Sequence, residues 1–395
     1  MGRVKYIDQL DLKNKKVFIR VDYNVPMDSS GNINDDTRIR ESLPTLNYVL
    51  EQGGPIILAS HLGKPKGKPE PKYSLLPVAK RLSELLKRDV IFANDCIGQE
   101  VQEKAKSLKP GQVLMLENLR FHAEEEKNDG TFAQKLAGLA DCYVNDAFGV
   151  SHRAHASVSA ITQYAKECAA GFLMKKEIAY FEKVMKEPAR PLVAIVGGAK
   201  VSGKLEVLEN LMKKVDSLLI GGGMAFTFLK AQGLEVGKSL VEDHLIPTAK
   251  KILDLARERG TNIVLPVDCV VADKMDASAQ AKTVDITSIP KECLGLDIGE
   301  KTVALFGEAI KNAKTIIWNG PLGVFEMKPF SQGTLGIIDR IVKSSAVSIV
   351  GGGDTDTAVH QAGKSKEFTF ISTGGGAFLE LLEGRELPGI KSLER

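Results

Sequence analysis

The chain has 395 residues, too many for one ordinary hydrophobic core, so we expect two domains. A hydrophobic fraction of 43% with 26% charged residues is typical of a soluble globular protein, and a net charge of +3 is too small to indicate a nucleic acid or a membrane surface as partner. Five widely spread cysteines without a Cys-x-x-Cys pair argue against a disulfide framework or a structural zinc site.

The N-terminal residues, from Met1 to Tyr6, are charged and alternating, unlike a signal peptide. No apolar run approaches the roughly 20 residues that span a bilayer. We therefore expect a reduced, cytoplasmic protein that binds small molecules, without a nucleic acid or membrane partner. Since neither a sticky helix face nor a sequence repeat is evident, we also expect a monomer.

Short apolar runs alternate with amphipathic helical patterns along the whole chain. In the first half the strand candidates are residues 17–21, 55–59, 90–92, 113–116 and 142–144, and residues 75–86 carry a helical apolar stripe. In the second half the strand candidates are residues 192–196, 217–220, 263–265, 315–318, 347–350 and 368–371. This pattern predicts an α/β protein with two doubly wound, Rossmann-like parallel sheets, whose ligands bind at the carboxyl ends of the strands.

The domain boundary falls in a helical pattern rich in lysine and glutamate at residues 171–187. Pro188 and Pro191 end this pattern. We expect a hinge helix there, between an N-terminal domain of residues 1–170 and a C-terminal domain of residues 188–376.

The apolar runs of the first half end in cationic, acidic or amide residues. Asp22 and Asn24 follow the first run, and their spacing points both to the same side, where they could hold a hydroxyl. The basic residues of this half that follow apolar runs or lie in loops are Arg38, His61, Lys64, Arg120, His152 and Arg153. Each alone is most simply a surface charge, but together they predict a site for a small molecule with several negative charges.

The apolar runs of the second half end in glycine clusters, at residues 197–198, 221–223, 320, 351–353 and 374–376. Glycine lets backbone amides approach a ligand, and helix N-termini behind such turns attract phosphate. Residues 198–205 nearly match a phosphate-binding P-loop, but Leu205 stands where a hydroxyl would hold magnesium. Lys200 and Lys204 could still contact phosphate, or they are solvated lysines at a helix start.

Two further glycine clusters predict phosphate chemistry. Asp354 follows glycines 351–353, and a carboxylate beside amide donors fits phosphate if a divalent metal bridges them; it could equally cap a helix that begins near Thr357. Glycines 374–376 precede a short helix and could stabilise a phosphoryl group in transfer. Two different anion sites, one in each half, are the layout of a phosphotransferase.

Other chemistries are disfavoured. His152 and His155 have no third ligand at metal-binding spacing, and the glutamates at 124–126 are most simply a solvated loop or helix start. No Gly-x-Gly-x-x-Gly follows a strand in the glycine loops, and no Gly-x-Ser-x-Gly occurs, which argues against a dinucleotide dehydrogenase and a serine hydrolase.

These residues together resemble the phosphoglycerate kinase family over essentially the whole chain. The matching stretches are Arg20-Val-Asp-Tyr-Asn-Val-Pro26, Ser60-His-Leu-Gly63, Leu116-Glu-Asn-Leu-Arg120, Asn145-Asp-Ala-Phe-Gly149, His152-Arg-Ala-His-Ala-Ser157, Gly197-Gly-Ala-Lys-Val201 and Trp318-Asn-Gly-Pro-Leu-Gly-Val-Phe-Glu326. The resemblance implies reversible phosphoryl transfer between 1,3-bisphosphoglycerate and Mg-ADP, giving 3-phosphoglycerate and ATP, in line and after hinge closure.

The resemblance also implies roles for individual residues. The 3-phosphoglycerate would be held by Asp22, Asn24, Arg38, His61, Leu62, Gly63, Lys64, Arg120 and Arg153. The nucleotide would be held by Lys204, Gly295, Glu326, Gly352, Gly353, Asp354 and Thr355, with Asp354 binding Mg²⁺ and Glu326 suited to the ribose. The phosphoryl group in flight would be stabilised by Arg38, Lys200 and the amides of Gly374, Gly375 and Gly376. The last stretch, about 377–395, would pack back on the N-terminal domain.

Three positions depart from the family pattern: Lys64 replaces an arginine, Phe378 a serine, and Asp356 an alanine. The lysine removes a bidentate fork and weakens one expected phosphate contact. Two alternatives to the kinase stay open, a P-loop-like NTPase and a non-catalytic nucleotide or metabolite sensor. A sensor would be expected to lack Lys200, Asp354 or Arg38, and all three are present.

Overall fold

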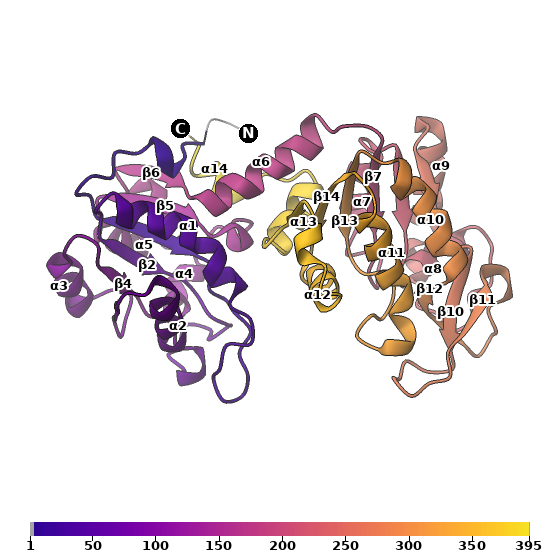
Figure 1. Ribbon diagram of the computed structural model, residues 1–395, viewed down its shortest axis with the longest axis horizontal. Helices are drawn as coiled ribbons and strands as arrows, with labels where there is room; N and C mark the ends of the chain where they lie inside the picture. The colour runs from indigo at the N-terminus through magenta and orange to yellow at the C-terminus, as the bar shows by residue number, and fades with distance from the viewer. Residues whose placement is uncertain (1–3, 395) are drawn as a thin grey trace. The chain divides into compact units, whose positions relative to one another are not determined.

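Two sheets of six parallel strands organise the computed structural model, which describes residues 4–394 (Figure 1). The chain divides into two units. Unit 1 contains the residues up to Ala179 and those from Glu386 onward, and unit 2 contains Tyr180–Arg385. The helix α6 (Phe172–Lys186) crosses from unit 1 into unit 2, at the place where the sequence predicts a hinge helix.

The sheet of unit 1 has the strand order β3-β4-β2-β1-β5-β6, and every pair of neighbours is parallel. Its strands are β1 (Val17–Val21), β2 (Ile56–Ala59), β3 (Val90–Phe92), β4 (Val113–Met115), β5 (Cys142–Asp146) and β6 (Glu167–Ala170). The helices of this unit are α1 (Thr37–Glu51), α2 (Leu76–Leu86), α3 (Gln99–Ser107), α4 (Ala123–Glu126), α5 (Gly130–Ala137) and α14 (Pro388–Lys391). β1, β2 and β5 are buried along their whole length, which is why their sequences are continuous apolar runs instead of alternating ones.

β1 lies in the middle of this sheet, between β2 and β5. The chain continues from β1 to β2 on one side, and it reaches β5 on the other side only after β3 and β4 have formed. Such a reversal of strand order leaves an opening at the carboxyl ends of the strands. The residues that follow β1 and β2 therefore lie where a ligand of a parallel sheet binds.

The C-terminal segment of the chain packs on unit 1. The amide of Gly389 donates to the Ser151 carbonyl at 2.8 Å, and the Asn145 side chain donates to the Gly389 carbonyl at 3.3 Å. The sequence places the start of this returning segment near residue 377, whereas in the structure it starts at Glu386. The preceding helix α13 (Gly376–Leu382) packs on α7 (Leu205–Met212) of unit 2 instead, where the Asn210 side chain of α7 donates to the Leu382 carbonyl at 2.6 Å.

The large sheet of unit 2 has the strand order β15-β14-β13-β7-β8-β9, again with parallel neighbours. Its strands are β7 (Leu192–Val196), β8 (Ser217–Ile220), β9 (Asn262–Val264), β13 (Thr315–Asn319), β14 (Val347–Gly351) and β15 (Phe370–Ile371). The other helices are α7 (Leu205–Met212), α8 (Ala225–Ala231), α9 (Ile246–Arg259), α10 (Glu300–Asn312), α11 (Gln332–Val342) and α12 (Gly353–Gln361). The core includes Trp318 of β13, which is fully buried.

A second, antiparallel sheet of unit 2 has the order β11-β10-β12. Its strands are β10 (Asp268–Ala272), β11 (Lys282–Asp285) and β12 (Leu294–Ile298). The two six-stranded parallel sheets confirm the predicted fold class, but this small sheet and β6 were not predicted. β11 is mostly exposed and polar, so the sequence carries no apolar run there.

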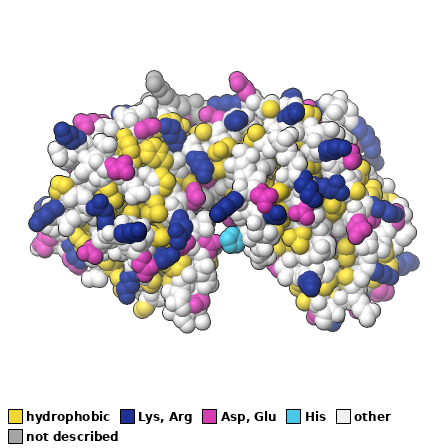
Figure 2. All heavy atoms as spheres, in the orientation of Figure 1, with side chains coloured by type: hydrophobic (Ala, Val, Ile, Leu, Met, Phe, Trp, Pro, Cys, Tyr) yellow, Lys and Arg dark blue, Asp and Glu magenta, His cyan; other side chains and the backbone are white. Residues whose placement is uncertain are grey.

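Charges of both signs are mixed over the surface. Figure 2 shows Lys or Arg side chains beside Asp or Glu side chains across the drawn face, in keeping with the small net charge of +3. Within residues 4–394, none of the helices combines the length and the apolarity that crossing a membrane requires.

Candidate functional site

Unit 1 gathers charged side chains where β1 and β2 end. Asp22 follows β1, and its carboxylate accepts a hydrogen bond from Nη1 of Arg38 in the first turn of α1. Nδ1 of His61, which follows β2, lies 3.8 Å from the same carboxylate. Burial raises the pKa of Asp22, but the charges of Arg38 and Arg20 and the hydrogen bond from the Asn24 amide act in the opposite direction, and the pKa is lowered to about 2. Asp22 is therefore ionised at neutral pH, and it orients Arg38.

His61 is neutral at this site. Burial lowers its pKa well below the ordinary value, and the nearby arginines lower it further. Nη2 of Arg20 lies 3.2 Å from Nδ1 of His61. Because a guanidinium can only donate, Nδ1 accepts and the ring proton resides on Nε2.

Buried hydrogen bonds through Ser157 to Glu125 fix the Arg20 side chain. Nε of Arg20 donates to the Ser157 hydroxyl at 2.9 Å. That hydroxyl donates to the Glu125 carboxylate at 2.6 Å, and the Ser157 amide donates to it at 2.9 Å. Arg20 and Glu125 are both fully buried. The expected helix start at residues 124–126 is confirmed by α4, but the expected solvation was wrong for Glu125, because Ser157 links this buried carboxylate to the buried arginine.

The loop after β2 is held in one conformation by the predicted residues themselves. The Gly63 amide donates to Oδ1 of Asn24 at 2.8 Å, and Nη1 of Arg120 donates to the Gly63 carbonyl at 2.8 Å. Gly63 has φ +62°, and a Cβ there would lie 2.3 Å from the ring of Tyr73, so only glycine fits. This geometry places Asn24, Gly63 and Arg120 side by side and leaves Lys64 exposed.

The guanidinium groups create a positive field in this part of unit 1. Burial lowers the pKa of His155 to about 3, and Arg120, Arg20 and Arg153 lower it in the same direction. Nε of Arg153 donates to Nε2 of His152 at 3.2 Å. Such a cluster of guanidiniums matches a ligand that carries several negative charges.

In unit 2, Lys204 lies in a partly buried position at the start of α7. Burial lowers the pKa of Lys204 to about 8, and Asp354 and Glu383 act in the opposite direction. The structure therefore brings Lys204 and Asp354 together, as the sequence predicts, and adds Glu383, which the sequence did not indicate. Lys200, in the loop before α7, is exposed.

The loop after β14 turns directly into α12. Gly352, with φ +101°, precedes the first helical residue, and the Gly320 amide donates to the Thr355 hydroxyl at 2.7 Å. Asp354 lies in the first turn of α12 and is exposed. The alternative of an Asp354 cap on a helix from Thr357 was therefore wrong, because the helix begins four residues earlier, at Gly353.

The glycines after β15 form the entry to α13. The Gly374 amide donates to the Ser372 hydroxyl at 3.1 Å, and Gly375, with φ +47°, precedes the first helical residue, Gly376. Gly374 is buried and Gly376 is exposed. The Gly374 amide thus already has a partner in the protein, whereas Gly375 and Gly376 stand at the open start of the helix.

Gly295 and Glu326 lie in two further segments of unit 2. The Gly295 amide, on β12, donates to the Ser239 hydroxyl at 2.9 Å, and a Cβ at this position would lie 2.0 Å from the Phe226 ring. Glu326 is exposed in the loop after β13.

A family model described as phosphoglycerate kinase matches residues 7–385. The chain belongs to the phosphoglycerate kinase family. Curated family members that carry this name include those of Geobacter metallireducens, 61% identical over 392 residues with 99% of this chain and 98% of the relative covered, and of Koribacter versatilis, 57% identical with 98% of each covered.

Solved phosphoglycerate kinase structures share the fold. The structure from Coxiella burnetii matches with a TM-score of 0.90 at 42% identity and covers 99% of each chain. The structure from Pyrococcus horikoshii OT3 matches with a TM-score of 0.86 at 35% identity and covers 98% of each chain. The enzyme is thus a glycolytic kinase of this family, and the alternative of a P-loop-like NTPase was wrong.

Sequence reasoning missed three residues near the predicted site residues: Arg20 and Glu125 in unit 1, and Glu383 beside Lys204 in unit 2. A signal for Arg20 was present, because a charged residue inside the apolar strand β1 needs buried partners. Nothing in the run of three glutamates distinguishes buried Glu125 from its neighbours.

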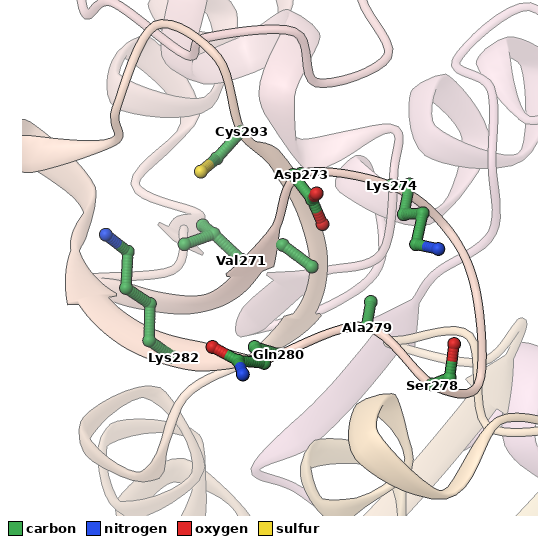
Figure 3. Close-up of a pocket in the computed structure, with 9 residues that line it drawn as sticks. Val271, Asp273, Lys274, Ser278, Ala279, Gln280, Lys282 and Cys293 are labelled. Atoms are coloured by element: carbon green, nitrogen blue, oxygen red, sulfur yellow. The ribbon is translucent and has the colours of Figure 1, made fainter.

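A hollow of about 430 Å³ also opens on the small sheet of unit 2 (Figure 3). Val271, Lys282 and Cys293 lie along the strands and their ends, and Lys274 and Ser278 lie on the loop that closes the other side. None of the predicted site residues lines it.

Proposed function

We infer that this protein transfers the acyl phosphate of 1,3-bisphosphoglycerate to Mg-ADP, reversibly, giving 3-phosphoglycerate and ATP. The observation that carries this inference is the ionised Asp22 with Arg38 and Arg20 beside it, within the arginine cluster of a phosphoglycerate kinase fold. Such a cluster suits a substrate with a phosphate at one end and a carboxylate or acyl phosphate at the other.

In unit 1 the predicted residues divide into two groups by their contacts. Arg120 and Arg153 supply the positive field and would bind the 3-phosphate, together with exposed Lys64. Asp22 and Asn24 offer oxygen and amide groups for the glycerate hydroxyl. Arg38 is one-third exposed, so its guanidinium can turn part of its donors toward a phosphoryl group while Asp22 holds the rest.

In unit 2 the proposed nucleotide site combines Lys204, the helix start at Gly352 to Thr355, and the ribose partner Glu326. The start of α12 offers backbone amides to phosphate, and Lys204 adds a positive charge. Gly295 has no side chain, so its backbone can lie directly against the Phe226 ring and against a ligand. We assign a different role to Lys200, Gly375 and Gly376, which would stabilise the phosphoryl group during its transfer.

Asp354 fits a magnesium ligand by its chemistry. Its carboxylate is exposed in the first turn of α12, and carboxylate oxygens are the ligands that Mg²⁺ prefers. Bound Mg²⁺ would neutralise charge on the nucleotide phosphates. The Thr355 hydroxyl accepts from Gly320 inside the protein, so Asp354 is the residue of this turn that we assign to the metal.

The reaction needs positioning more than acid–base chemistry. A carboxylate is already a nucleophile and an acyl phosphate already has a good leaving group, so no general base is required. The residues hold both partners in line and neutralise charge. We propose that the two units close on their substrates during turnover, which excludes water that would otherwise accept the phosphoryl group.

The remaining expectations are proposals as well. We propose a monomer that works in the cytoplasm without a nucleic acid or membrane partner. The five cysteines are all free thiols, as in proteins of reducing compartments.

An acyl-phosphate trap tests the proposed function. With ATP, Mg²⁺ and 3-phosphoglycerate in the presence of hydroxylamine, we expect a glyceroyl hydroxamate in step with ADP, and no ADP without 3-phosphoglycerate. Formation of ADP without hydroxamate would mean a hydrolase, and absence of both would mean a sensor.

A matched pair of variants tests the role of Arg38. Arg38→Ala should lower kcat by about 100-fold or more while ADP affinity stays unchanged, since a positioned charge is lost from the transition state. Arg40→Ala is the control, because Arg40 lies on the same helix and pairs with Asp36 on the surface. Equal effects of the two substitutions would contradict the role of Arg38.

A further inference from the structure

Three side chains of metal-ligand type meet in unit 1 at the carboxyl ends of β3 and β4. They are Asp95, Cys96 and His122, whose ligand atoms all lie within 4.8 Å of one another. Asp95 and Cys96 follow β3, and His122 follows the short helix after β4. Among the residues that the structure describes, this is the one group of three such side chains at this spacing.

One carboxylate holds the group together. Oδ1 of Asp95 lies 2.6 Å from Nε2 of His122 and accepts from the Cys96 amide at 2.6 Å. Sγ of Cys96 lies within 4.8 Å of this carboxylate and of the His122 imidazole. A carboxylate, an imidazole and a thiol therefore face one small space, in which one cation could bind all three.

A backbone hydrogen bond and a ring contact fix the positions of the segments that carry the three ligands. The Glu117 amide donates to the Asp95 carbonyl at 3.4 Å, which joins the segment after β3 to the segment after β4. The His122 ring packs against Phe132 with centroids 5.3 Å apart. Cys96 is fully buried, whereas the Asp95 side chain is 48% exposed and the His122 side chain is 25% exposed. The group therefore has a closed side at the sulfur and an open side at the carboxylate.

The donor set selects the kind of metal. Thiolate and imidazole favour Zn²⁺ over Mg²⁺ or Ca²⁺, which prefer oxygen. Bonds of about 2.0–2.3 Å in a tetrahedral site place donor atoms about 3.5 Å apart. Rotation of the exposed Asp95 side chain would open its 2.6 Å contact with His122 to that separation.

We propose that Asp95, Cys96 and His122 bind one Zn²⁺ ion, with water as the fourth ligand. The thiol proton passes to the buffer as the Zn–S bond forms. The Nε2 proton that faces Asp95 is released while Nδ1 takes up one from solvent, so that the imidazole binds as a neutral ligand through Nε2. The ligands come from two separate segments of the sequence and include a single cysteine, so a search for Cys-x-x-Cys spacing does not predict this site. The ion would link the ends of β3 and β4 and stabilise the folded form by binding it alone.

Cobalt titration of the chelator-treated full chain tests the proposal. Co²⁺ reports its ligands by colour, and we expect one equivalent to give an intense near-ultraviolet thiolate-to-metal band together with the visible bands of a tetrahedral site. Zn²⁺ should abolish these bands. Co²⁺ at the proposed nucleotide site would lack the thiolate band, since no cysteine is assigned there.

Two variants and one control complete the test. Cys96→Ser and His122→Phe should each weaken Zn²⁺ binding on the order of 100-fold in equilibrium dialysis and remove the rise in unfolding temperature that Zn²⁺ gives the parent chain. Cys168→Ala, at another buried thiol of unit 1, should leave both unchanged. No thiolate band in the parent chain, or a band that persists in Cys96→Ser while circular dichroism shows a folded protein, would overturn the proposal. The His122→Phe variant decides the matter if Cys96→Ser does not fold.

Discussion

The pH dependence of nucleotide binding offers a sensitive test of Lys204. Burial lowers the pKa of this lysine to about 8, so it changes charge in a range where most lysines stay protonated. A phosphate ligand favours the charged form and would raise this pKa on binding. ADP affinity should therefore fall as the pH rises through 8, because the free enzyme then has to take up a proton to bind.

The size of the effect follows from the pKa. At pH 7 about ten of eleven Lys204 side chains carry the proton, and at pH 9 about one of eleven does. The affinity for Mg-ADP should therefore fall about tenfold between these values, which corresponds to about 1.4 kcal/mol. The ADP phosphates stay fully ionised across most of this range, so they add little to the slope.

Isothermal titration calorimetry of Mg-ADP from pH 7 to 9 measures this slope. In Lys204→Arg the slope should vanish, since a guanidinium stays charged throughout, and Lys204→Met should bind weakly at every pH. Lys213→Met is the control, because Lys213 ends the same helix α7 and is exposed. A flat profile in the parent enzyme, or an unchanged slope in Lys204→Arg, would refute the reasoning.

Two further predictions concern stability. Burial raises the pKa of Asp146 to about 7, so between pH 4 and 7 the unfolded chain ionises this carboxyl while the folded chain keeps its proton, and stability falls as the pH rises. Urea unfolding measures this fall as a decrease in the free energy of unfolding between pH 5 and 8. The decrease should be about 3 kcal/mol smaller in Asp146→Asn than in the parent protein, and the same pH dependence in both proteins would contradict the raised pKa. A Cβ at Gly351 would lie 1.9 Å from the Phe378 ring, so Gly351→Ala should cost about 1–3 kcal/mol. In the same assay that cost should shrink in a Phe378→Ser background, and strict additivity of the two changes would contradict the contact.

The fold was predictable where burial leaves a strong pattern. β1 and β7 are buried at every position and read as continuous apolar runs, so their bounds were predicted to the residue. β11 is mostly exposed, and its pairing with β10 is fixed by tertiary contacts that leave no local pattern. The helix start at Gly353 was missed because a glycine at this position reads as loop, whereas the backbone turns into α12 directly.

The site was predictable where a polar residue follows a strand. Asp22 follows β1, the family resemblance assigns Arg38 to the same substrate, and the two side chains form a hydrogen bond in the structure. Glu125 could not, since its burial follows from a long-range contact with Ser157 and, through it, Arg20. Phe378 illustrates the same limit: its departure from the family pattern reads as a lost hydroxyl, and the structure instead shows a buried ring against Gly351.

The stereochemical course of the transfer tests the central claim most directly. If the two half-sites pass the phosphoryl group in one in-line step, ATP made chiral at its γ-phosphorus with oxygen isotopes should transfer that phosphorus to 3-phosphoglycerate with inversion. Retention of configuration would mean two successive transfers through a phosphorylated enzyme, and it would contradict the direct transfer proposed for this protein.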